Sequence, residues 1–372
     1  MKDVAAAAGV AQSTVSRILN RAPGRVTITV ETRERVEAKA RELGYRPHPG
    51  ARALRGASTM LLGAIVRDIT DPFNAGVIET LTVAAKERGY GVVLGCAGAR
   101  TDEALATVLE ARQCDAIVLL GDLRGEPRMI ADLRGAGVPV VALWYGSHHP
   151  FPTVSVDNRA GVREALMHLS SLGHRRIAFV GGGSHGDIRE RRAAYKEYLA
   201  SADIAATRGY VRQGPNTITD GGLALSALLA LPRPPTAILA ATDVVAMGLI
   251  HAAYEQGIAV PEQLSIVGFD DIPLAAATAP GLTTVKMPTA EMIAWAVELA
   301  VGAAGSPFHA AGDPPRIVFQ PKLIVRRSTA AAPPTVPAKT PSPAPGTRSS
   351  SRPIRAAVTR PRGNTDPSRR GI

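Results

Sequence analysis

The chain has 372 residues, of which 45% are hydrophobic and 20% are charged. This length predicts about two to three domains, and the composition is typical of a globular protein that buries a core. No apolar run reaches the roughly 18 residues of a membrane helix, and the chain opens with a polar-faced segment instead of a signal peptide. We therefore expect no membrane contact, a cytoplasmic protein, and no disulfide between Cys96 and Cys114.

The net charge of +11 is distributed unevenly along the chain. Residues 1–56 contain 11 Lys and Arg against 5 Asp and Glu, and residues 331–372 contain 8 against 1. Residues 57–330, in contrast, contain 24 against 26. A basic head on a near-neutral body is typical of nucleic-acid binding and does not fit a generally basic protein. The eight histidines lack the spacing of metal ligands, so we expect neither a metal nor a cofactor.

The first twenty residues predict two short helices joined by a tight turn at Gly9, which can adopt the left-handed backbone that ends a helix. Apolar side chains recur at helical spacing at Val4, Ala8, Val15, Ile18 and Leu19. Polar side chains fill the outer face of the second helix at Gln12, Ser13, Ser16 and Arg17. This pattern predicts a helix-turn-helix whose second helix lies in the DNA major groove, although an ordinary helical hairpin has the same pattern.

A third helix is expected to begin after Thr29, a suitable N-cap with Glu31 in the first turn, and to end at Gly44. Its inward face has Val36, Ala40 and Leu43. Three helices around one small core predict a headpiece over residues 1–46, which is a marginal size for a domain on its own.

A linker that contains Pro and Gly, followed by a short helix, is expected over residues 47–57. So few residues do not hold a helix alone in water, but they can fold when docked on a partner. Leu54 lies between Arg52 and Arg55, which fits an apolar wedge in the minor groove flanked by phosphate contacts.

The amino-terminal region resembles that of the LacI/GalR family of bacterial transcription regulators. The residues that carry the resemblance are 3–5, 8–10, 14–20, 32–36 and 43–47, and the resemblance continues through the body to about Thr329. It implies a repressor that binds a near-palindromic operator on double-stranded DNA as a homodimer, with two hinge helices meeting in the dimer. It also implies control by a small-molecule effector, a sugar or nucleoside-like metabolite, and hence a nucleoid-associated protein that is not an enzyme.

The body of the chain alternates between apolar strands and helices. The expected strands are 61–66, 90–94, 116–120, 138–143, 176–180, 237–240, 265–269, 317–319 and 323–325. The expected helices are 73–88, 102–112, 127–134, 159–172, 188–200, 244–256 and 288–304, the last one crossing back toward the first half. Continuous apolar strands between helices predict parallel sheets covered on both faces, in two similar α/β lobes over residues 58–329. The resemblance implies the fold of periplasmic sugar-binding proteins, with a ligand cleft between the lobes.

Residues 330–372 are rich in Pro, Ala, Ser and Arg and cannot bury enough apolar surface to fold. We expect a disordered basic tail there. It either adds nonspecific attraction to DNA or is a solvated extension without a role.

The expected DNA contacts begin at the start of the second helix, where base edges come within reach. Arg17 can pair with guanine and Gln12 with adenine, whereas Ser13 and Thr14 could instead contact phosphate only. By resemblance, Gln12, Ser13 and Arg17 read bases and Leu54 enters the minor groove. The complete set of expected DNA-binding residues is Gln12, Ser13, Thr14, Ser16, Arg17, Asn20, Thr32, Ala51 and Leu54.

The expected effector site lies at the carboxyl ends of the parallel strands, where ligands bind in α/β folds. Aromatic rings can stack on a small polyhydroxylated ligand while charged groups exchange hydrogen bonds with it. The resemblance assigns Phe73, Arg191, Thr242 and Asp270 to this role. Trp144 is proposed from its position alone, and an aromatic ring packed at the edge of the site is the alternative. The complete set of expected effector-binding residues is Phe73, Asn74, Trp144, Arg191, Thr242 and Asp270.

Two other functions are compatible with the same two-lobed body: solute binding and catalysis. A solute-binding protein shares the two lobes, but it would have a secretion signal instead of a basic helical head. Residues 181–186 spell both the Gly-x-Ser-x-Gly of α/β-hydrolases, around Ser184, and the Gly-x-Gly-x-x-Gly of dinucleotide sites. His251 and His309 have no recognisable catalytic setting, and Asp203 follows a helix rather than a strand. We therefore expect no catalytic residue and interpret this loop as a rim of the cleft that leads to Arg191.

Two positions depart from the family pattern. Ala11 stands where the family usually has a serine that caps the second helix, and losing a cap costs about 1 kcal/mol. Thr242 replaces a common asparagine in the expected effector site.

Overall fold

The computed structural model describes residues 1–19, 28–45, 58–66, 68–96, 114–121, 131, 133, 135, 137–144, 151–183, 186–304 and 314–334. Several expected features lie outside these ranges: Asn20, Ala51, Leu54, Ser184, the segment 47–57, the helix at 102–112, most of the helix at 127–134 and the tail from 335. Within the ranges, no helix combines the length and the apolar character that crossing a membrane requires. Cys96 is exposed and Cys114 is buried.

Three short helices form the amino-terminal headpiece: α1 (Lys2–Ala8), α2 (Gln12–Leu19) and α3 (Val30–Glu42). Gly9 ends α1 with a φ of 64°, and the Thr29 hydroxyl caps α3 by accepting the Thr32 N–H, so the predicted turn and cap are confirmed. Leu43, expected on the inward face, is instead 49% exposed, because it follows the last helical residue. The helices enclose one apolar core of Val4, Ala5, Ala8, Val15, Ile18, Val36 and Ala40.

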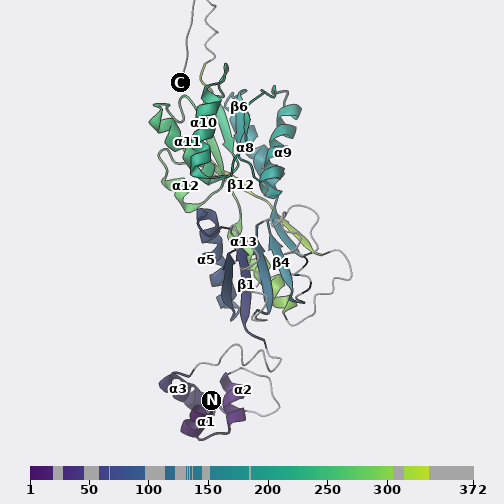
Figure 1. The fold of residues 1–372 in the computed structure, drawn as a ribbon, viewed down its shortest axis with the longest axis vertical. Coiled ribbons are helices and arrows are strands. Elements are labelled where there is room, and N and C mark those ends of the chain that lie inside the picture. The colour runs from purple at the N-terminus through teal and green to yellow at the C-terminus, as the bar shows by residue number, and fades with distance from the viewer. Residues whose placement is uncertain are drawn as a thin grey trace, which may run out of the picture. The chain divides into compact units, whose positions relative to one another are not determined.

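Six strands form the sheet of the first lobe, in the order β11-β5-β4-β3-β1-β2 (Figure 1). They are β1 (Leu61–Val66), β2 (Gly91–Cys96), β3 (Ala116–Leu120), β4 (Val140–Leu143), β5 (Thr153–Val156) and β11 (Arg316–Phe319). Every adjacent pair is parallel, as predicted. Two helices that pack against each other, α5 (Pro72–Glu87) and α13 (Thr289–Ala303), belong to this lobe, and α13 also packs on β3 and β4.

The second lobe has a sheet in the order β12-β10-β9-β8-β6-β7. Its strands are β6 (Ile177–Val180), β7 (Val211–Arg212), β8 (Ala237–Ala240), β9 (Ser265–Asp270), β10 (Thr283–Lys286) and β12 (Lys322–Ile324). Its helices are α8 (Asn158–Ser171), α9 (Gly186–Ser201), α10 (Ile218–Leu229), α11 (Asp243–Glu255) and α12 (Pro273–Ala277). Strand β12 pairs antiparallel with β10, so this one edge differs from the predicted parallel pairing that the rest of the sheet has. The cause is that β12 follows β11 almost directly and enters the lobe from the side where the parallel strands end.

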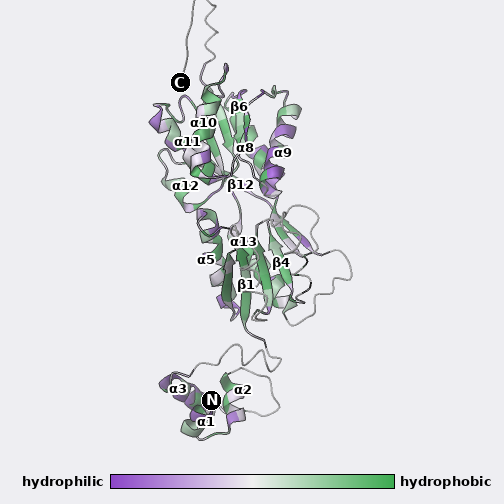
Figure 2. Ribbon diagram, viewed as in Figure 1, coloured by the Kyte–Doolittle hydropathy of each residue, from purple (hydrophilic) through white to green (hydrophobic). Residues whose placement is uncertain are grey.

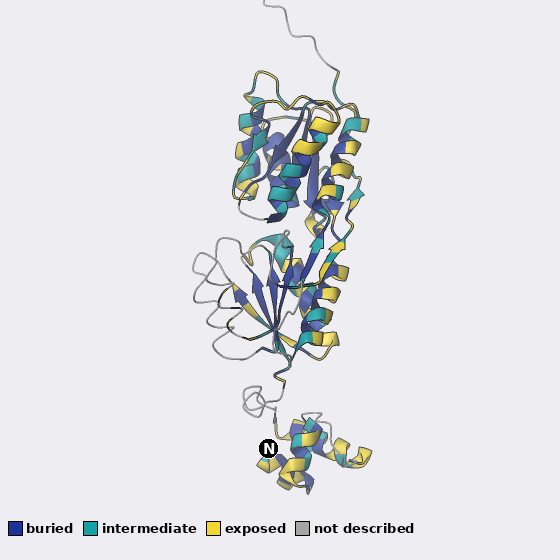
Figure 3. Ribbon diagram, turned by 90° about the vertical axis from the view of Figure 1, so that its right-hand side faces the viewer, coloured by how far each residue is buried: buried dark blue, intermediate teal, exposed yellow. Residues whose placement is uncertain are grey.

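The central strands are among the most apolar parts of both lobes (Figure 2) and also among the most buried (Figure 3). Strands β3, β4, β6 and β8 are buried at every residue. The outward faces of the flanking helices remain exposed (Figure 3). This is the pattern that continuous apolar runs predict for the central strands of a parallel sheet.

The chain passes between the two lobes three times: from β5 into α8, from β10 into α13, and from β11 into β12. The second passage confirms the prediction that the helix at 288–304 returns to the first half. The lobes also touch away from these passages, because Phe73 of α5 packs against the core cluster of the second lobe.

The last described segment packs on the second lobe. The buried ring of His174 lies 3.0 Å from the Ala330 carbonyl oxygen through Nε2, and the Ala332 N–H donates to the Leu172 carbonyl at 2.8 Å. The packed chain therefore extends a few residues past Thr329, where the composition changes, because these backbone groups find partners on the lobe.

Helices α10 and α11 approach each other at two glycines. A Cβ atom on Gly221 would lie 2.4 Å from the Val245 carbonyl oxygen, and one on Gly248 would lie 2.0 Å from the Ile218 carbonyl oxygen. Backbones can come this close only where no side chain intervenes. The close packing of these helices therefore depends on both glycines.

We predict that Gly248→Ala lowers the free energy of unfolding by about 1–3 kcal/mol, the usual cost of forcing atoms into a packed interface. Gly222→Ala is the matched control, because its Cβ would meet only the Ala252 Cβ, at 3.6 Å. Alanine there gains up to about 1 kcal/mol of helix propensity. Urea unfolding followed by circular dichroism measures both variants, and a Gly248→Ala protein as stable as the wild type would contradict this account of the packing.

Candidate functional site

The outer face of α2 presents the predicted DNA-reading residues to solvent. Val15 and Ile18 are buried in the headpiece core. The other side of the helix has, in order, exposed Gln12 and Ser13, half-buried Thr14 and Ser16, and exposed Arg17. The headpiece core therefore holds one side of this helix and leaves Gln12, Ser13 and Arg17 exposed on the other.

The ends of the headpiece helices are held by both backbone and side-chain groups. The Ala11 carbonyl accepts the N–H groups of Thr14 and Val15 at 2.9 and 3.2 Å, but an alanine side chain cannot cap the remaining donors of α2. Arg35, which sequence reasoning missed, donates through Nε to the Ala8 carbonyl at 3.1 Å and so ties α3 to the end of α1. Half-buried Thr32 lies in the first turn of α3, where its hydroxyl accepts the Thr29 hydroxyl at 2.9 Å.

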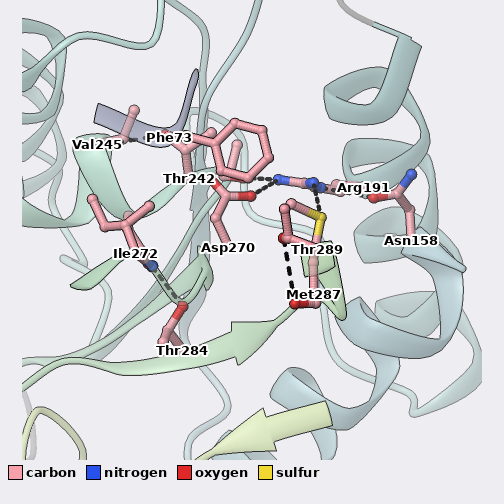
Figure 4. Close-up of polar contacts among 12 residues, drawn as sticks. Phe73, Asn158, Arg191, Thr242, Val245, Asp270, Ile272, Thr284, Met287 and Thr289 are labelled. Atoms are coloured by element: carbon pink, nitrogen blue, oxygen red, sulfur yellow. Dashed lines mark hydrogen bonds and ion pairs between the residues drawn. The ribbon is translucent and has the colours of Figure 1, made fainter. Parts of the chain in front are cut away.

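Phe73 and Asn74 lie in the first turn of α5, after Asp71, whose carboxylate accepts the Phe73 N–H at 2.9 Å. The Phe73 ring meets the Trp144 ring edge-on, with 5.1 Å between centroids and 69° between planes. The Asn74 amide is engaged locally, because its Nδ2 donates to the Asp68 carbonyl at 2.7 Å. Phe73 reaches the group around Arg191 from the first lobe (Figure 4).

Trp144 follows β4, is 3% exposed and has a left-handed φ of 55°. Its backbone N–H donates to the Val154 carbonyl at 2.9 Å, so strand pairing continues as far as this residue. Its indole Nε1 is buried and has no hydrogen-bond partner among the described residues. The ring therefore packs edge-on against Phe73, which agrees with the alternative that Trp144 is an aromatic residue packed at the edge of the site. Its buried Nε1–H is also a hydrogen-bond donor that proteins rarely leave unpaired.

Arg191 lies at the centre of the predicted effector site (Figure 4). It projects from α9 and is 3% exposed. Its Nε donates to Asn158 Oδ1 at 2.8 Å, and its Nη1 donates to the Ala241 carbonyl at 2.7 Å and to Asp270 Oδ1 at 3.1 Å. The guanidinium carbon lies 3.6 Å from the centroid of the Phe269 ring, a cation–π contact. Groups from three separate segments of the second lobe thus fix the orientation of one side chain.

One amino group of Arg191 is held only weakly. The guanidinium has five N–H donors, of which Nε supplies one and each of the two amino groups supplies two. Nη2 contacts the Met287 sulfur at 3.6 Å, and a thioether sulfur is a weak acceptor. Among the residues that the structure describes, Nη2 has no oxygen acceptor, so it can still donate to one.

Asp270 ends β9 and is 7% exposed. Burial raises the pKa of its carboxyl well above the usual 3.8, while the Arg191 charge lowers the pKa and the nearby carboxylates of Asp243 and Asp71 raise it. On the opposite side of Arg191, the Asn158 amide is itself oriented, because its Nδ2 donates to Glu190 Oε2 at 3.1 Å. The guanidinium therefore lies between a fixed amide oxygen and a buried carboxylate.

Thr242 and Asp243 begin α11. The Thr242 hydroxyl caps the helix by accepting the Val245 N–H at 3.3 Å, and within the described part of the chain its own proton has no acceptor. Asp243 is completely buried, and its carboxylate accepts the Ile272 N–H at 2.9 Å and the Thr284 hydroxyl. Burial raises the pKa of Asp243 to about 7, although both of these hydrogen bonds lower it.

The glycine loop after β6 packs closely against its neighbours. A Cβ on Gly181, whose φ is 149°, would lie 2.1 Å from the Ala241 Cβ. The Gly182 N–H donates to Asn216 Oδ1 at 3.0 Å. A cavity of about 200 Å³, lined in part by Arg212, opens beside this loop in the second lobe. Close packing thus accounts for Gly181, which begins the dinucleotide-type motif, and for Gly182, which begins the hydrolase-type motif.

Sequence reasoning missed three buried members of the site. Asn158 and Met287 lie at the first and second passages between the lobes, next to the short strands β5 and β10, which were not expected. Asp243 follows Thr242 in the sequence, but nothing in the sequence places it under the turn after β9. Among the described residues, no group of three or more His, Cys, Asp or Glu could hold a metal ion.

Comparisons with known proteins identify the family. Residues 1–48 match the family described as bacterial regulatory proteins, lacI family, and residues 166–329 match the periplasmic binding protein-like domain. The HTH-type transcriptional repressor CytR of Escherichia coli (strain K12) is 34% identical over 336 residues, which are 90% of this chain and 97% of CytR. The chain belongs to the LacI family. It is therefore a DNA-binding transcription regulator, and the resemblance noted in the sequence is confirmed.

Solved structures agree with this LacI-family assignment. The complex of the transcriptional regulator CelR with cellobiose has a TM-score of 0.65 and 30% identity, covering 88% of this chain and 98% of that chain. The lac repressor dimer bound to operator and the anti-inducer ONPF has a TM-score of 0.76 and 26% identity, with the same coverage. The predicted architecture is confirmed: a helix-turn-helix headpiece and two parallel-sheet lobes similar to those of periplasmic binding proteins.

We predict that Asp243→Asn becomes increasingly stabilising relative to the wild type as the pH rises from about 4 to about 7. The pKa of Asp243 is about 7 in the folded protein, against a usual 3.8, so the folded state holds this proton more tightly than the unfolded chain. The carboxyl group therefore costs stability progressively across that window, and an amide does not titrate. Urea unfolding of both proteins at several pH values measures the difference, and a difference that is independent of pH would contradict the assignment.

Proposed function

We propose that this LacI-family protein is a homodimeric repressor of a near-palindromic operator, whose operator affinity changes when a sugar or nucleoside-like effector binds between the lobes. The observation that carries the effector part is the buried Arg191 guanidinium, whose Nη2 has only a sulfur partner among the described residues. The relatives support the proposal: CytR is named a repressor, the lac repressor is a dimer on its operator, and CelR is complexed with cellobiose. Such a protein works in the cytoplasm, on the nucleoid.

In this proposal, α2 enters the major groove and its exposed side chains read base edges. Arg17 pairs with a guanine and Gln12 with an adenine, and Ser13 lies beside them. Other polar residues contact phosphates, which position the protein without specifying a sequence. These proposed phosphate contacts are Thr14, Ser16, Asn20 and Thr32. The proposed hinge contacts in the minor groove are Ala51 and Leu54.

The proposed effector contacts divide by chemistry. Arg191 donates from Nη2 to a ligand oxygen, Asp270 accepts a ligand hydroxyl, and Thr242 donates its remaining proton. Phe73 and Trp144 supply the apolar faces against which a sugar ring or base packs, and a ligand oxygen near Trp144 would pair its buried Nε1. The proposed set is Phe73, Asn74, Trp144, Arg191, Thr242 and Asp270.

We also propose that the protein is not an enzyme. The close contacts of Gly181 and Gly182 give the glycine loop a packing role that needs no catalytic serine. The proposed domain boundaries are 1–46 for the headpiece, 47–57 for the hinge, 58–329 for the two lobes and 330–372 for the tail. The packing of Ala330 and Ala332 on the second lobe favours moving the start of the tail a few residues further on.

We predict that Arg17→Ala weakens binding by about 5- to 150-fold for each half-site of the preferred operator, because one bidentate base contact is worth about 1–3 kcal/mol. It should also relax the sequence preference at one position of each half-site. Arg41→Ala is the control, since it removes the same charge from exposed α3 and should leave the preference unchanged. Selection of binding sites from random DNA gives the operator and both preferences. An Arg17→Ala protein that selects the wild-type sequence equally well would overturn the proposed base contact.

We predict that a panel of pentoses, hexoses, disaccharides and nucleosides contains a compound that raises the thermal unfolding midpoint, because ligand binding stabilises the folded state by mass action. Arg191→Lys should abolish that increase, since lysine keeps the charge but lacks the planar fork. Arg192→Lys, at the next position of α9, where Arg192 contacts Gln213, should keep it. Circular dichroism confirms that each variant is folded. An equal increase in Arg191→Lys and the wild type would refute the proposed role of Arg191.

A further inference from the structure

The turn that follows β9 has an unusual backbone. Asp270 and Asp271 have φ values of 117° and 56°, in the left-handed half of conformational space that residues other than glycine rarely adopt. Such conformations persist only where surrounding contacts hold them, and they often lie at functional sites. The turn therefore needs anchors, and the structure provides one for each residue from 270 to 272.

Two of these anchors are ion pairs on the two aspartates. Asp270 accepts from Arg191 Nη1 at 3.1 Å. Asp271 accepts from Arg326 Nη2 at 2.6 Å, and Lys286 Nζ lies 4.0 Å from its other oxygen. The first pair is the pair proposed to bind the effector, and the second joins the turn to the chain that follows β12.

The third anchor is Asp243, which lies beneath the turn. Its Oδ2 accepts the Ile272 N–H at 2.9 Å, and its Oδ1 accepts the Thr284 hydroxyl of β10. Strand β9 leaves room for this carboxylate at Gly268, because a Cβ there would lie 2.2 Å from Asp243 Oδ1. The first residue of α11 is thus connected to β10 and to the residue that ends the turn.

We propose that Asp243 is a positioning residue of the effector site, which holds the turn at 270–272 so that Asp270 faces Arg191. Asp243 acts through the turn, because both of its carboxylate oxygens are engaged within the protein, one by the Ile272 N–H and the other by the Thr284 hydroxyl. The inference rests on the proposed function for the role of Arg191 and Asp270. It adds a buried hydrogen-bond acceptor, and the glycine opposite it, to the residues on which effector binding depends.

Four substitutions distinguish a role of Asp243 as a hydrogen-bond acceptor from a role that only fills space. In Asp243→Asn, the amide oxygen can still accept the Ile272 N–H while the amide nitrogen donates to the Thr284 hydroxyl. In Asp243→Ala, the Ile272 N–H loses its acceptor. Gly268→Ala would push the carboxylate away without removing it. Thr284→Val removes the other partner of Asp243 and leaves the Ile272 hydrogen bond in place.

Hydrogen–deuterium exchange of the full-length protein, read at the Ile272 amide and across α11, tests the proposal. We expect exchange at Ile272 to become at least about tenfold faster in Asp243→Ala and Gly268→Ala. In Asp243→Asn and Thr284→Val it should stay within about threefold of the wild type, and exchange across α11 should be unchanged in all four variants.

Three outcomes would overturn the proposal: wild-type exchange at Ile272 in Gly268→Ala and Asp243→Ala, equal acceleration in Asp243→Asn and Asp243→Ala, or acceleration that spreads evenly over α11. If Asp243→Ala does not fold, the comparison of Gly268→Ala with Asp243→Asn still decides. The experiment uses no effector, so its failure is distinct from a failure of the sugar and nucleoside panel, which tests the proposed function.

Discussion

The burial of one positive charge, on Arg191, is the constraint that organises the second lobe and its junction with the first. A guanidinium removed from water is tolerated only when its donors are paired, because the cost of desolvation is otherwise large. Here the partners are Asn158 at the start of α8, the Ala241 carbonyl before α11, and Asp270 at the end of β9. The backbone positions of three elements are therefore tied to the position of one side chain, and the Phe269 ring closes the remaining face.

The same contacts link the proposed effector site to the segments that join the lobes. Asn158 follows the first passage between the lobes, and Met287 begins the second. In the proposed function, a ligand oxygen that replaces the Met287 sulfur at Arg191 Nη2 changes contacts at these passages, and so changes the closure of the lobes. Because binding free energies are linked, an effector that alters operator affinity must have its own affinity altered by the operator to the same extent.

Local signals in the sequence were enough to predict the headpiece and most of the body. Gly9 and Thr29 end and begin helices as expected, and the apolar runs at 61–66, 116–120 and 237–240 are strands. The elements missed are those with weak local signals: the two-residue strand β7, the short β5, β10 and α12, and α10. Helix α10 contains Gly221-Gly222, which lower helix propensity but allow its close approach to α11.

The residues of the candidate site likewise include some that were predicted and some that were not. The sheet edge where ligands bind was expected from the strand pattern, the family resemblance assigned Phe73, Arg191 and Asp270 to it, and the structure brings these residues together. Asn158, Asp243 and Met287 could not be predicted, because their roles depend on side chains more than 30 residues away in the sequence meeting in three dimensions. For the same reason, the sequence gives no indication that the Asn74 amide is bonded to the Asp68 carbonyl.

The most direct test of effector control is a measurement of this reciprocity. Fluorescence anisotropy gives operator affinity with and without the sugar or nucleoside from the panel that stabilises the wild type most, and calorimetry gives the affinity of that compound with and without operator. If the effector controls operator binding, both measurements give the same factor, in the range of about 5- to 150-fold. A compound that binds at the site of Arg191 and leaves operator affinity unchanged would contradict effector control.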